Sequence, residues 1–191
     1  DIMLAEYADA KVHVAHISSA RAVDIVRQAK ARGVKVTAEA TPQHMTMTDD
    51  CVELFDSSTK INPPLREQKD VDAVLEGLKD GTIDCIVTDH SPHAQEEKDR
   101  EYIYAPSGFP GLETAVGVMM TDLVHTGKLD VAEGMPADIT VIDPELEWTV
   151  DAKKFYTKGS HSPFVGRKLK GRPVMTFVDG KMVMKDGEIL A

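Results

Sequence analysis

The chain has 191 residues, 42% of them hydrophobic, which suffices for the buried core of one domain, or of one domain with a small appendage. Its formal net charge of −10 repels polyanions, so we expect no nucleic acid partner. No apolar stretch approaches the roughly 20 residues that cross a bilayer, and no basic leader opens the chain. We therefore expect a cytoplasmic protein that makes no contact with a membrane.

Short β-branched runs alternate with amphipathic segments in the first two thirds of the chain. This pattern predicts a parallel sheet whose strands are joined by crossover helices. The predicted elements, in chain order, are a strand at 12–17, a helix that stops at Gly33, a strand at 34–40, a helix that stops at Gly81 and a strand at 83–88.

The segment 94–111 is charged, lacks a hydrophobic period and contains prolines and glycines typical of turns. We expect it to form a mobile surface loop that closes over a ligand. A helix is predicted to follow at 112–125, with Gly127 as its stop.

The texture changes near residue 131 to short strands and tight turns. The pair Asp179-Gly180 between two β-rich runs is a strong hairpin signal. We therefore expect two regions: an α/β region at 1–130 and a small β-sandwich module at 131–191.

Two polar side chains are predicted at the carboxyl ends of strands. His16 ends the first strand and Asp89 ends the third, while Asn62 and His93 lie on loops that leave the same edge. Functional side chains gather at this edge in parallel sheets. Because imidazole and carboxylate are good ligands for zinc-type ions, which generate hydroxide at neutral pH, the pattern predicts a hydrolase site.

Structural roles compete with these functional ones. A single His16 near a strand end is typical of a hydrogen-bonded structural residue, and Asp89 alone suits a cap. The run TDHSPH at 88–93 favours function, because it crowds a carboxylate and two imidazoles onto one junction. The rigid run NPPLR at 62–66 fits a plain turn as well as an amide and guanidinium that hold an anionic substrate.

The other candidate residues have simpler interpretations. His44 is expected to form a supporting hydrogen bond and His13 to pack in the core. The two cysteines, Cys51 and Cys85, form no CxxC pair, so we expect them to be reduced packing residues.

Five motifs, in this order, closely resemble the C-terminal half of bacterial dihydroorotases of the amidohydrolase superfamily. The motif ADITVID at 137–143 and the run SPFVG at 162–166 resemble the small β module of the same enzymes. The five motifs are VHVAHISS at 12–19, TAEATPQH at 37–44, INPPLR at 61–66, TDHSPH at 88–93 and GFPGLET at 108–114.

The resemblance implies a metal-dependent (β/α)₈ barrel, present here only in its last strands, that interconverts N-carbamoyl-L-aspartate and L-dihydroorotate in pyrimidine synthesis. It implies zinc, as one or two ions, with His16 and Asp89 as ligands. Asp89 would also shuttle a proton between hydroxide and the ring nitrogen. Asn62 and His93 would bind substrate together with the backbone of Ser107 and Gly108, although the family pattern has an aromatic residue in place of Ser107.

Several parts of the family pattern are missing. The first-strand His-x-His pair, the bridging carboxylate or carbamylated lysine, the fifth-strand histidine and the substrate arginine would all precede Asp1. We also expect a shortened join at 129–134, where relatives carry a further helical stretch. The chain starts with Asp rather than Met, so we interpret it as part of a longer enzyme and expect it to be inactive alone.

Two other functions remain open. One is another cyclic amidohydrolase, such as a hydantoinase or an allantoinase, although Asn62 and His93 favour the dihydroorotase interpretation. The other is a non-catalytic dihydroorotase-like subunit that supports an aspartate transcarbamoylase assembly. Association as a homodimer or with aspartate transcarbamoylase is compatible with the resemblance.

Overall fold

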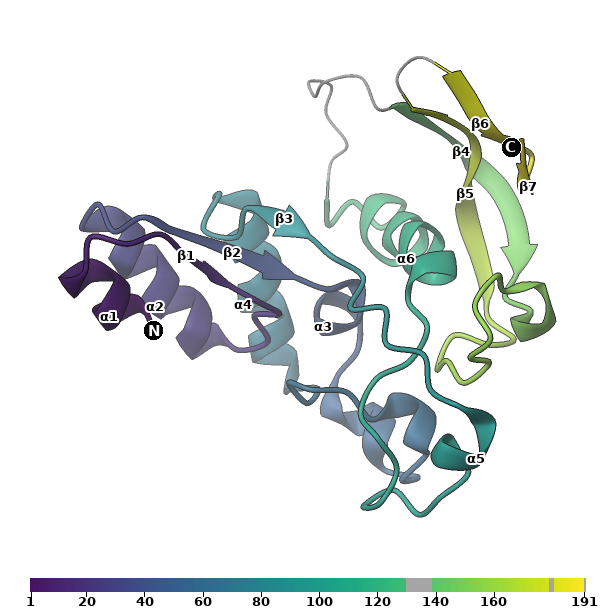
Figure 1. Cartoon of the computed structure of the whole chain (residues 1–191), viewed down its shortest axis with the longest axis horizontal. Coiled ribbons are helices and arrows are strands. Elements are labelled where there is room, and N and C mark those ends of the chain that lie inside the picture. The colour runs from purple at the N-terminus through teal and green to yellow at the C-terminus, as the bar shows by residue number, and fades with distance from the viewer. Residues whose placement is uncertain (130–138, 179–180, 191) are drawn as a thin grey trace. The chain divides into compact units, whose positions relative to one another are not determined.

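The computed structural model describes residues 1–129, 139–178 and 181–190. The chain divides into two compact units (Figure 1). The first comprises Asp1–Leu112 with Ala152–Pro163, and the second comprises Glu113–Asp151 with Phe164–Ala191. The expected boundary near residue 130 and the expected join at 129–134 fall almost wholly outside the described residues.

The first unit is built on a parallel sheet with strand order β1-β2-β3 (Figure 1). The partners β1 and β2 are in register from Val12 opposite Val36, and Glu39 of β2 lies opposite Cys85 of β3. The three strands are shorter than predicted, because the chain leaves each strand early to form the loops at its carboxyl end. Their bounds are β1 Val12–Val14, β2 Val36–Ala40 and β3 Cys85–Ile86.

Crossover helices connect these strands, as predicted. Helix α2 (Ala20–Ala31) begins where the Ser19 hydroxyl accepts a hydrogen bond from the Ala22 amide, and helix α4 (Gln68–Lys79) precedes β3. Shorter helices are α1 (Ile2–Tyr7), α3 (Pro42–Thr46) and α5 (Gln95–Lys98). The last of these lies in the segment predicted to be an irregular loop.

The core of the first unit lies between the helices and one face of the sheet. Alternation along β2 buries Val36, Ala38 and Ala40, whereas Thr37 and Glu39 face the other side. Each fully buried aliphatic side chain contributes about 1.5–3 kcal/mol. The opposite face of the sheet, which carries Thr37 and Glu39, is not used for packing against these helices and can hold functional side chains. The buried residues of α2 and α4 are Val23, Val26, Ala29, Val71, Val74 and Leu75.

The second unit contains an antiparallel sheet with strand order β4-β5-β6-β7. The predicted hairpin strands are present, although the turn Asp179-Gly180 lies outside the described residues. The elements are α6 (Leu112–Met119), which continues as a π-helical segment at Met120–Val124, then β4 (Ile139–Thr149), β5 (Lys168–Val178), β6 (Lys181–Lys185) and β7 (Glu188–Ile189).

None of the helices within the described ranges combines the length and the apolar character needed to cross a bilayer.

Candidate functional site

The two predicted ligand residues meet beyond the carboxyl ends of two strands. His16 follows β1 by two residues, and Asp89 lies three residues beyond β3. The Nε2 atom of His16 is 3.9 Å from Oδ1 of Asp89, and both side chains are largely shielded from solvent. The convergence expected from sequence is therefore observed, although β1 and β3 are not neighbours in the sheet.

Both residues have an unusual backbone conformation. His16 and Asp89 each have φ of 48°, in the left-handed region. This conformation costs about 1–2 kcal/mol for a residue with a Cβ atom. Such strain is concentrated at functional sites, where the rest of the structure enforces it. In this chain the two left-handed residues lie just beyond the ends of their strands, and their side chains approach each other to 3.9 Å.

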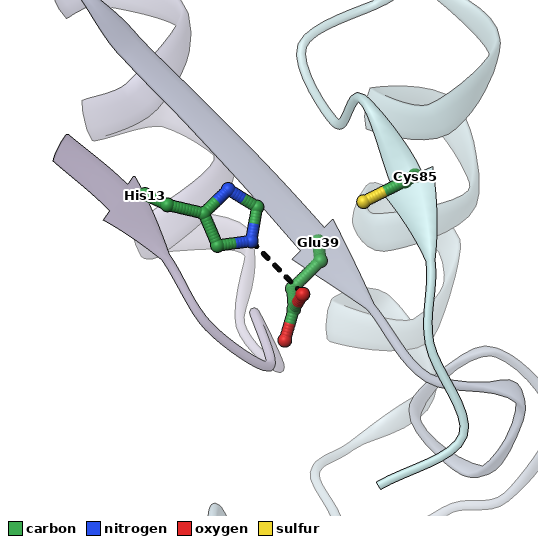
Figure 2. A group of neighbouring side chains, drawn as sticks. All are labelled: His13, Glu39 and Cys85. Atoms are coloured by element: carbon green, nitrogen blue, oxygen red, sulfur yellow. Dashed lines mark hydrogen bonds and ion pairs between the residues drawn. The ribbon is translucent and has the colours of Figure 1, made fainter. Parts of the chain in front are cut away.

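Glu39 of β2 joins this pair, and sequence reasoning assigned it no role. Its Oε1 atom lies 3.3 Å from Nε2 of His16, and its Oε2 atom lies 2.9 Å from Nε2 of His13 (Figure 2). The available signal was strand alternation, which places Glu39 on the open face together with Thr37. A carboxylate thus bridges two histidines of the first strand segment.

The expectation that His13 packs in the core is wrong. Its side chain is 44% exposed, and its Nδ1 atom is 2.7 Å from Oγ1 of Thr37. His13 lies directly opposite Thr37 in the parallel pair, so its ring reaches along the open face to Glu39 as well. Hydrogen bonds across the strands therefore place this histidine.

Cys85 lies next to the same group. Ligand atoms of His13, Glu39 and Cys85 all lie within 4.8 Å of one another (Figure 2). Partial burial, with the nearby carboxylates of Glu39 and Asp84, raises the pKa of the Cys85 thiol, so it is protonated at neutral pH and is a poor metal ligand in this state. Both cysteines are free as expected, but neither is buried in the core, so the expectation that Cys51 and Cys85 are packing residues is wrong.

The donors around His16 suit a divalent cation. One imidazole nitrogen and two carboxylates face one another, and imidazole with carboxylate oxygen is the ligand chemistry of zinc-type ions. The His16 and Asp89 atoms lie close enough for one ion to touch both after a small side-chain movement. The residues present therefore fit a metal, and they supply part of a coordination sphere.

His44 supports the site through hydrogen bonds, as predicted. Its ring is 2% exposed, with Nδ1 2.8 Å from Oγ1 of Thr41 and Nε2 2.8 Å from the Pro63 carbonyl. The carbonyl can only accept, so Nε2 carries the proton and Nδ1 accepts from the threonine hydroxyl. Burial lowers the pKa of His44, against the raising effect of the Pro63 carbonyl, which keeps the ring neutral.

The loop 61–66 presents Asn62 between two buried anchors. Ile61 and Leu65 are buried, whereas the Asn62 side chain is exposed. The His44 ring holds the carbonyl of Pro63, the next residue along the chain. The loop is therefore fixed on both sides of an amide that is open to a ligand.

His93 contacts the second loop predicted to bind substrate. Its Nε2 donates to the Ser107 carbonyl at 2.9 Å. Both backbone groups of Gly108 are also engaged, because its N–H donates to the Lys60 carbonyl at 2.8 Å and its carbonyl accepts from Lys98. His93, Ser107 and Gly108 are thus brought together. Their hydrogen-bonding groups named above are bonded to other groups of the chain.

The remaining residues of the TDHSPH run brace this arrangement. The Ser91 hydroxyl donates to Oδ1 of Asp89 at 3.2 Å, and Nδ1 of His90 accepts from the Gly111 and Leu112 amides. His90 therefore joins the loop after β3 to residues 111–112 within the first unit. This role belongs to structure rather than to ligand binding.

Solved structures define the class of protein. L-Hydantoinase from Arthrobacter aurescens matches with a TM-score of 0.91 and 29% identity, over 100% of this chain and 48% of that protein. D-Hydantoinase from Thermus sp. matches with a TM-score of 0.85 and 26% identity, over 99% of this chain and 48% of that protein. The fold is that of the hydantoinase-type amidohydrolases: the last strands of a (β/α)₈ barrel with a small antiparallel β module.

Curated relatives identify the nearer group. The chain is 50% identical to dihydroorotase from Pelotomaculum thermopropionicum over 97% of its own length and 49% of the relative. It is 44% identical to dihydroorotase from Endomicrobium trichonymphae, over 96% of its length and 49% of that relative. No family model matches the sequence. The chain is a homologue of the dihydroorotases, and it spans about half the length of the curated relatives it matches.

The extent of the match bears on the expectation that this chain is part of a longer enzyme. A span of about half of each relative is consistent with a C-terminal half. The alignment with the Pelotomaculum protein covers 208 positions, more than the 191 residues of the chain, so the relative has positions that this chain lacks.

Proposed function

We propose that this chain is part of a metal-dependent dihydroorotase that interconverts N-carbamoyl-L-aspartate and L-dihydroorotate in pyrimidine synthesis. The observation that carries this proposal is the approach of His16 Nε2 to Asp89 Oδ1, at 3.9 Å, in a homologue of dihydroorotases. Hydrolysis of a cyclic amide at neutral pH needs hydroxide, a polarised carbonyl and an acid for the leaving nitrogen. A metal and a neighbouring carboxylate supply these together.

His16 and Asp89 are the residues that would hold the metal, which we propose to be zinc. The ion supplies Lewis acidity for the amide carbonyl and lowers the pKa of water toward neutrality. Oε1 of Glu39 lies 3.3 Å from Nε2 of His16, so this carboxylate faces the position that a metal bound to His16 would take. The remaining ligands are not among the residues assigned here, so we expect the chain by itself to be inactive.

Asp89 is proposed as the proton carrier. In ring opening, its carboxylate takes a proton from the attacking water and gives it to the departing ring nitrogen; ring closure reverses both transfers. The Ser91 hydroxyl bonds the oxygen that approaches His16, which leaves the second carboxylate oxygen to exchange protons. One carboxylate thus serves both directions of the reaction.

Substrate binding is proposed for Asn62, His93 and the backbone at Ser107 and Gly108. The exposed amide of Asn62 suits the polar groups of N-carbamoyl-L-aspartate. His93 and Gly108 are engaged with other parts of the chain, so His93 would exchange its bond to the Ser107 carbonyl for one to substrate. A hydrogen-bond exchange of this kind costs little net free energy.

The main alternative is a hydantoinase, which the names of the structural neighbours favour. The identity of 50% to a dihydroorotase against 29% to a hydantoinase favours dihydroorotase. The other alternative, a non-catalytic subunit, is disfavoured by the presence of both His16 and Asp89 in the chain. A homodimer, association with aspartate transcarbamoylase, a cytoplasmic location and a boundary between 1–130 and 131–191 remain predictions.

Turnover by the full-length protein tests the proposal. Purified protein with zinc is assayed with dihydroorotate, hydantoin and allantoin, and dihydroorotate is expected to give the highest kcat/KM. Preference for hydantoin or allantoin would move the protein to the alternative class. Absence of all three activities, together with absence of bound metal, would support the non-catalytic subunit.

A further inference from the structure

A single lysine binds three carbonyl groups in the segment 102–108, within the loop predicted to be mobile. The Nζ atom of Lys60 donates to the carbonyls of Tyr102 at 2.8 Å, Ile103 at 3.1 Å and Ala105 at 2.7 Å. It also lies 5.4 Å from the centre of the Tyr102 ring. An ammonium group has three protons to donate, so these three carbonyls match the full donor capacity of the Lys60 side chain.

A second lysine continues the pattern. Nζ of Lys98 donates to the carbonyls of Pro106 at 3.0 Å and Gly108 at 2.9 Å, while His93 binds the Ser107 carbonyl between them. Six carbonyls of the segment 102–108 therefore accept hydrogen bonds from three basic side chains. Charged donors form roughly twice as strong a bond as neutral ones, so this loop is tethered by strong contacts.

Burial of the charged Lys98 side chain costs free energy. Its residue is 2% exposed, and burial together with the nearby charge of Lys60 lowers its pKa to about 8, against the opposing effect of Asp56. A buried ammonium group costs free energy that its hydrogen bonds to the Pro106 and Gly108 carbonyls must offset. The value of Lys98 therefore lies in the geometry it imposes on the loop carbonyls.

The same contacts join the two predicted substrate loops. The Gly108 N–H donates to the Lys60 carbonyl, two residues before Asn62, and the Ser57 hydroxyl donates to the Lys98 carbonyl. Among the described residues, the Ser107 N–H donates to no backbone carbonyl, and neither do those of Tyr102 and Ile103. The loop thus keeps backbone donors available, and the two lysine charges favour an anionic acceptor near them.

We propose that Lys60 and Lys98 are positioning residues that hold the segment around Ser107 and Gly108 in the conformation that presents the Ser107 N–H to substrate, before substrate arrives. The inference rests on the proposed function, because the substrate role of this loop does. A loop that is already ordered spares the substrate the entropy of ordering it. Losing either lysine lowers the fraction of protein in the competent conformation and raises the apparent dissociation constant in proportion.

The first measurement is steady-state kinetics on the full-length protein with dihydroorotate. Lys98→Met and Lys60→Met are each expected to raise KM about tenfold while kcat changes less, because neither side chain is assigned to the reacting atoms. The matched control is Lys30→Met, since Nζ of Lys30 also binds a carbonyl, that of Gly81, and pairs with Asp84. This control is expected to lose stability with KM unchanged.

The second measurement is amide hydrogen exchange in the same proteins, which does not depend on activity. Lys98→Met is expected to accelerate exchange in 102–108, and Lys30→Met is not. Equal exchange in wild type and Lys98→Met, or the same rise in KM for Lys30→Met, would overturn the proposal. If Lys98→Met does not fold, the less buried Lys60→Met decides by the same two criteria.

Failure of the proposed function gives a different result. If the wild-type protein does not turn over dihydroorotate but the lysine variants show faster amide exchange in 102–108, the proposed activity is wrong and the positioning role of the lysines stands. If the wild-type protein turns over dihydroorotate and both lysine variants have an unchanged KM, the proposed activity stands and the positioning role of the lysines is wrong.

Discussion

The two units of the chain use their polar and apolar residues differently. In the first unit the parallel strands are short, and charged or imidazole side chains gather where the strands end. In the second unit the antiparallel strands β4 and β5 are long, and Gly117 of α6 lies where an added Cβ would meet Trp148 and Leu169. The candidate chemistry therefore lies in the first unit, whereas apolar packing is close in both, as at Gly77, where an added Cβ would lie 2.8 Å from Cγ1 of Val23.

Because the candidate site residues lie in the first unit, we expect substitutions in the second unit to change stability without changing activity. The first unit accepts left-handed backbone at His16 and Asp89 and a buried cation at Lys98, all of which cost free energy. In the second unit, Trp148 donates to the Gly171 carbonyl and the Arg172 guanidinium lies 5.3 Å from its ring centre. Substitutions in the two units should therefore have different signatures.

The largest effect is expected from Asp89→Asn in the full-length protein. The amide cannot carry the proton, so kcat should fall by about 10²–10⁴-fold with little change in the unfolding midpoint. The control is Asp84→Asn, because Asp84 pairs with Lys30 and accepts from the Ala38 amide, both structural contacts. Turnover by Asp89→Asn within a few-fold of wild type would remove the proton-carrier role.

Gly108→Ala tests the backbone of the substrate loop. Gly108 has φ of +114°, and a Cβ there would lie 2.5 Å from Cβ of Ser91 and 3.3 Å from Nε2 of His93. The loop must shift, so we expect KM to rise about tenfold and stability to fall by about 1–3 kcal/mol. Gly33→Ala is the control, since it has positive φ but no atom within 4 Å. A larger KM effect in the control would contradict this assignment.

Gly117→Ala tests the second unit alone. An added Cβ would lie 2.7 Å from Cζ2 of Trp148 and 2.9 Å from Cδ1 of Leu169, so overpacking should cost about 1–3 kcal/mol. Trp148 is the single tryptophan of this chain, and its fluorescence during urea unfolding reports the change. KM should stay unchanged. Gly127→Ala, with a φ of +70° but open space around the added atom, is the comparison, and a smaller loss at Gly117 than at Gly127 would contradict overpacking.

The smallest effect is a pH dependence carried by His44. Its lowered pKa means that, below about pH 6.5, the unfolded chain binds a proton that the folded chain excludes. Stability from this residue is therefore fully present above that pH and declines as pH falls, by at most about 1.4 kcal/mol per pH unit. Urea unfolding at pH 5.5 and 7.5 should show a smaller difference for His44→Gln than for wild type. An unchanged difference would contradict the neutral, buried state.

Much of the first unit follows from local patterns. The helix expected to stop at Gly33 is present as α2, in which Val23, Val26 and Ala29 are buried, and the Ser19 side chain caps its start. The positions of His16 and Asp89 at strand ends predicted their approach, because parallel strands present their carboxyl ends at one edge. Local patterns failed for His13 and both cysteines, because burial depends on which face of the sheet the helices cover.

The sequence by itself determined the order of strands and helices, the hairpin runs of the second unit and the likeness to dihydroorotases, since periodicity and motifs are local properties of the chain. Only the tertiary structure decided that Glu39 bridges His13 and His16, and that Lys60 and Lys98 tether residues 102–108. Many of these contacts join side chains to distant groups across loops that have no repeating pattern. No periodicity encodes such partners, because the folded backbone must first bring donor and acceptor together.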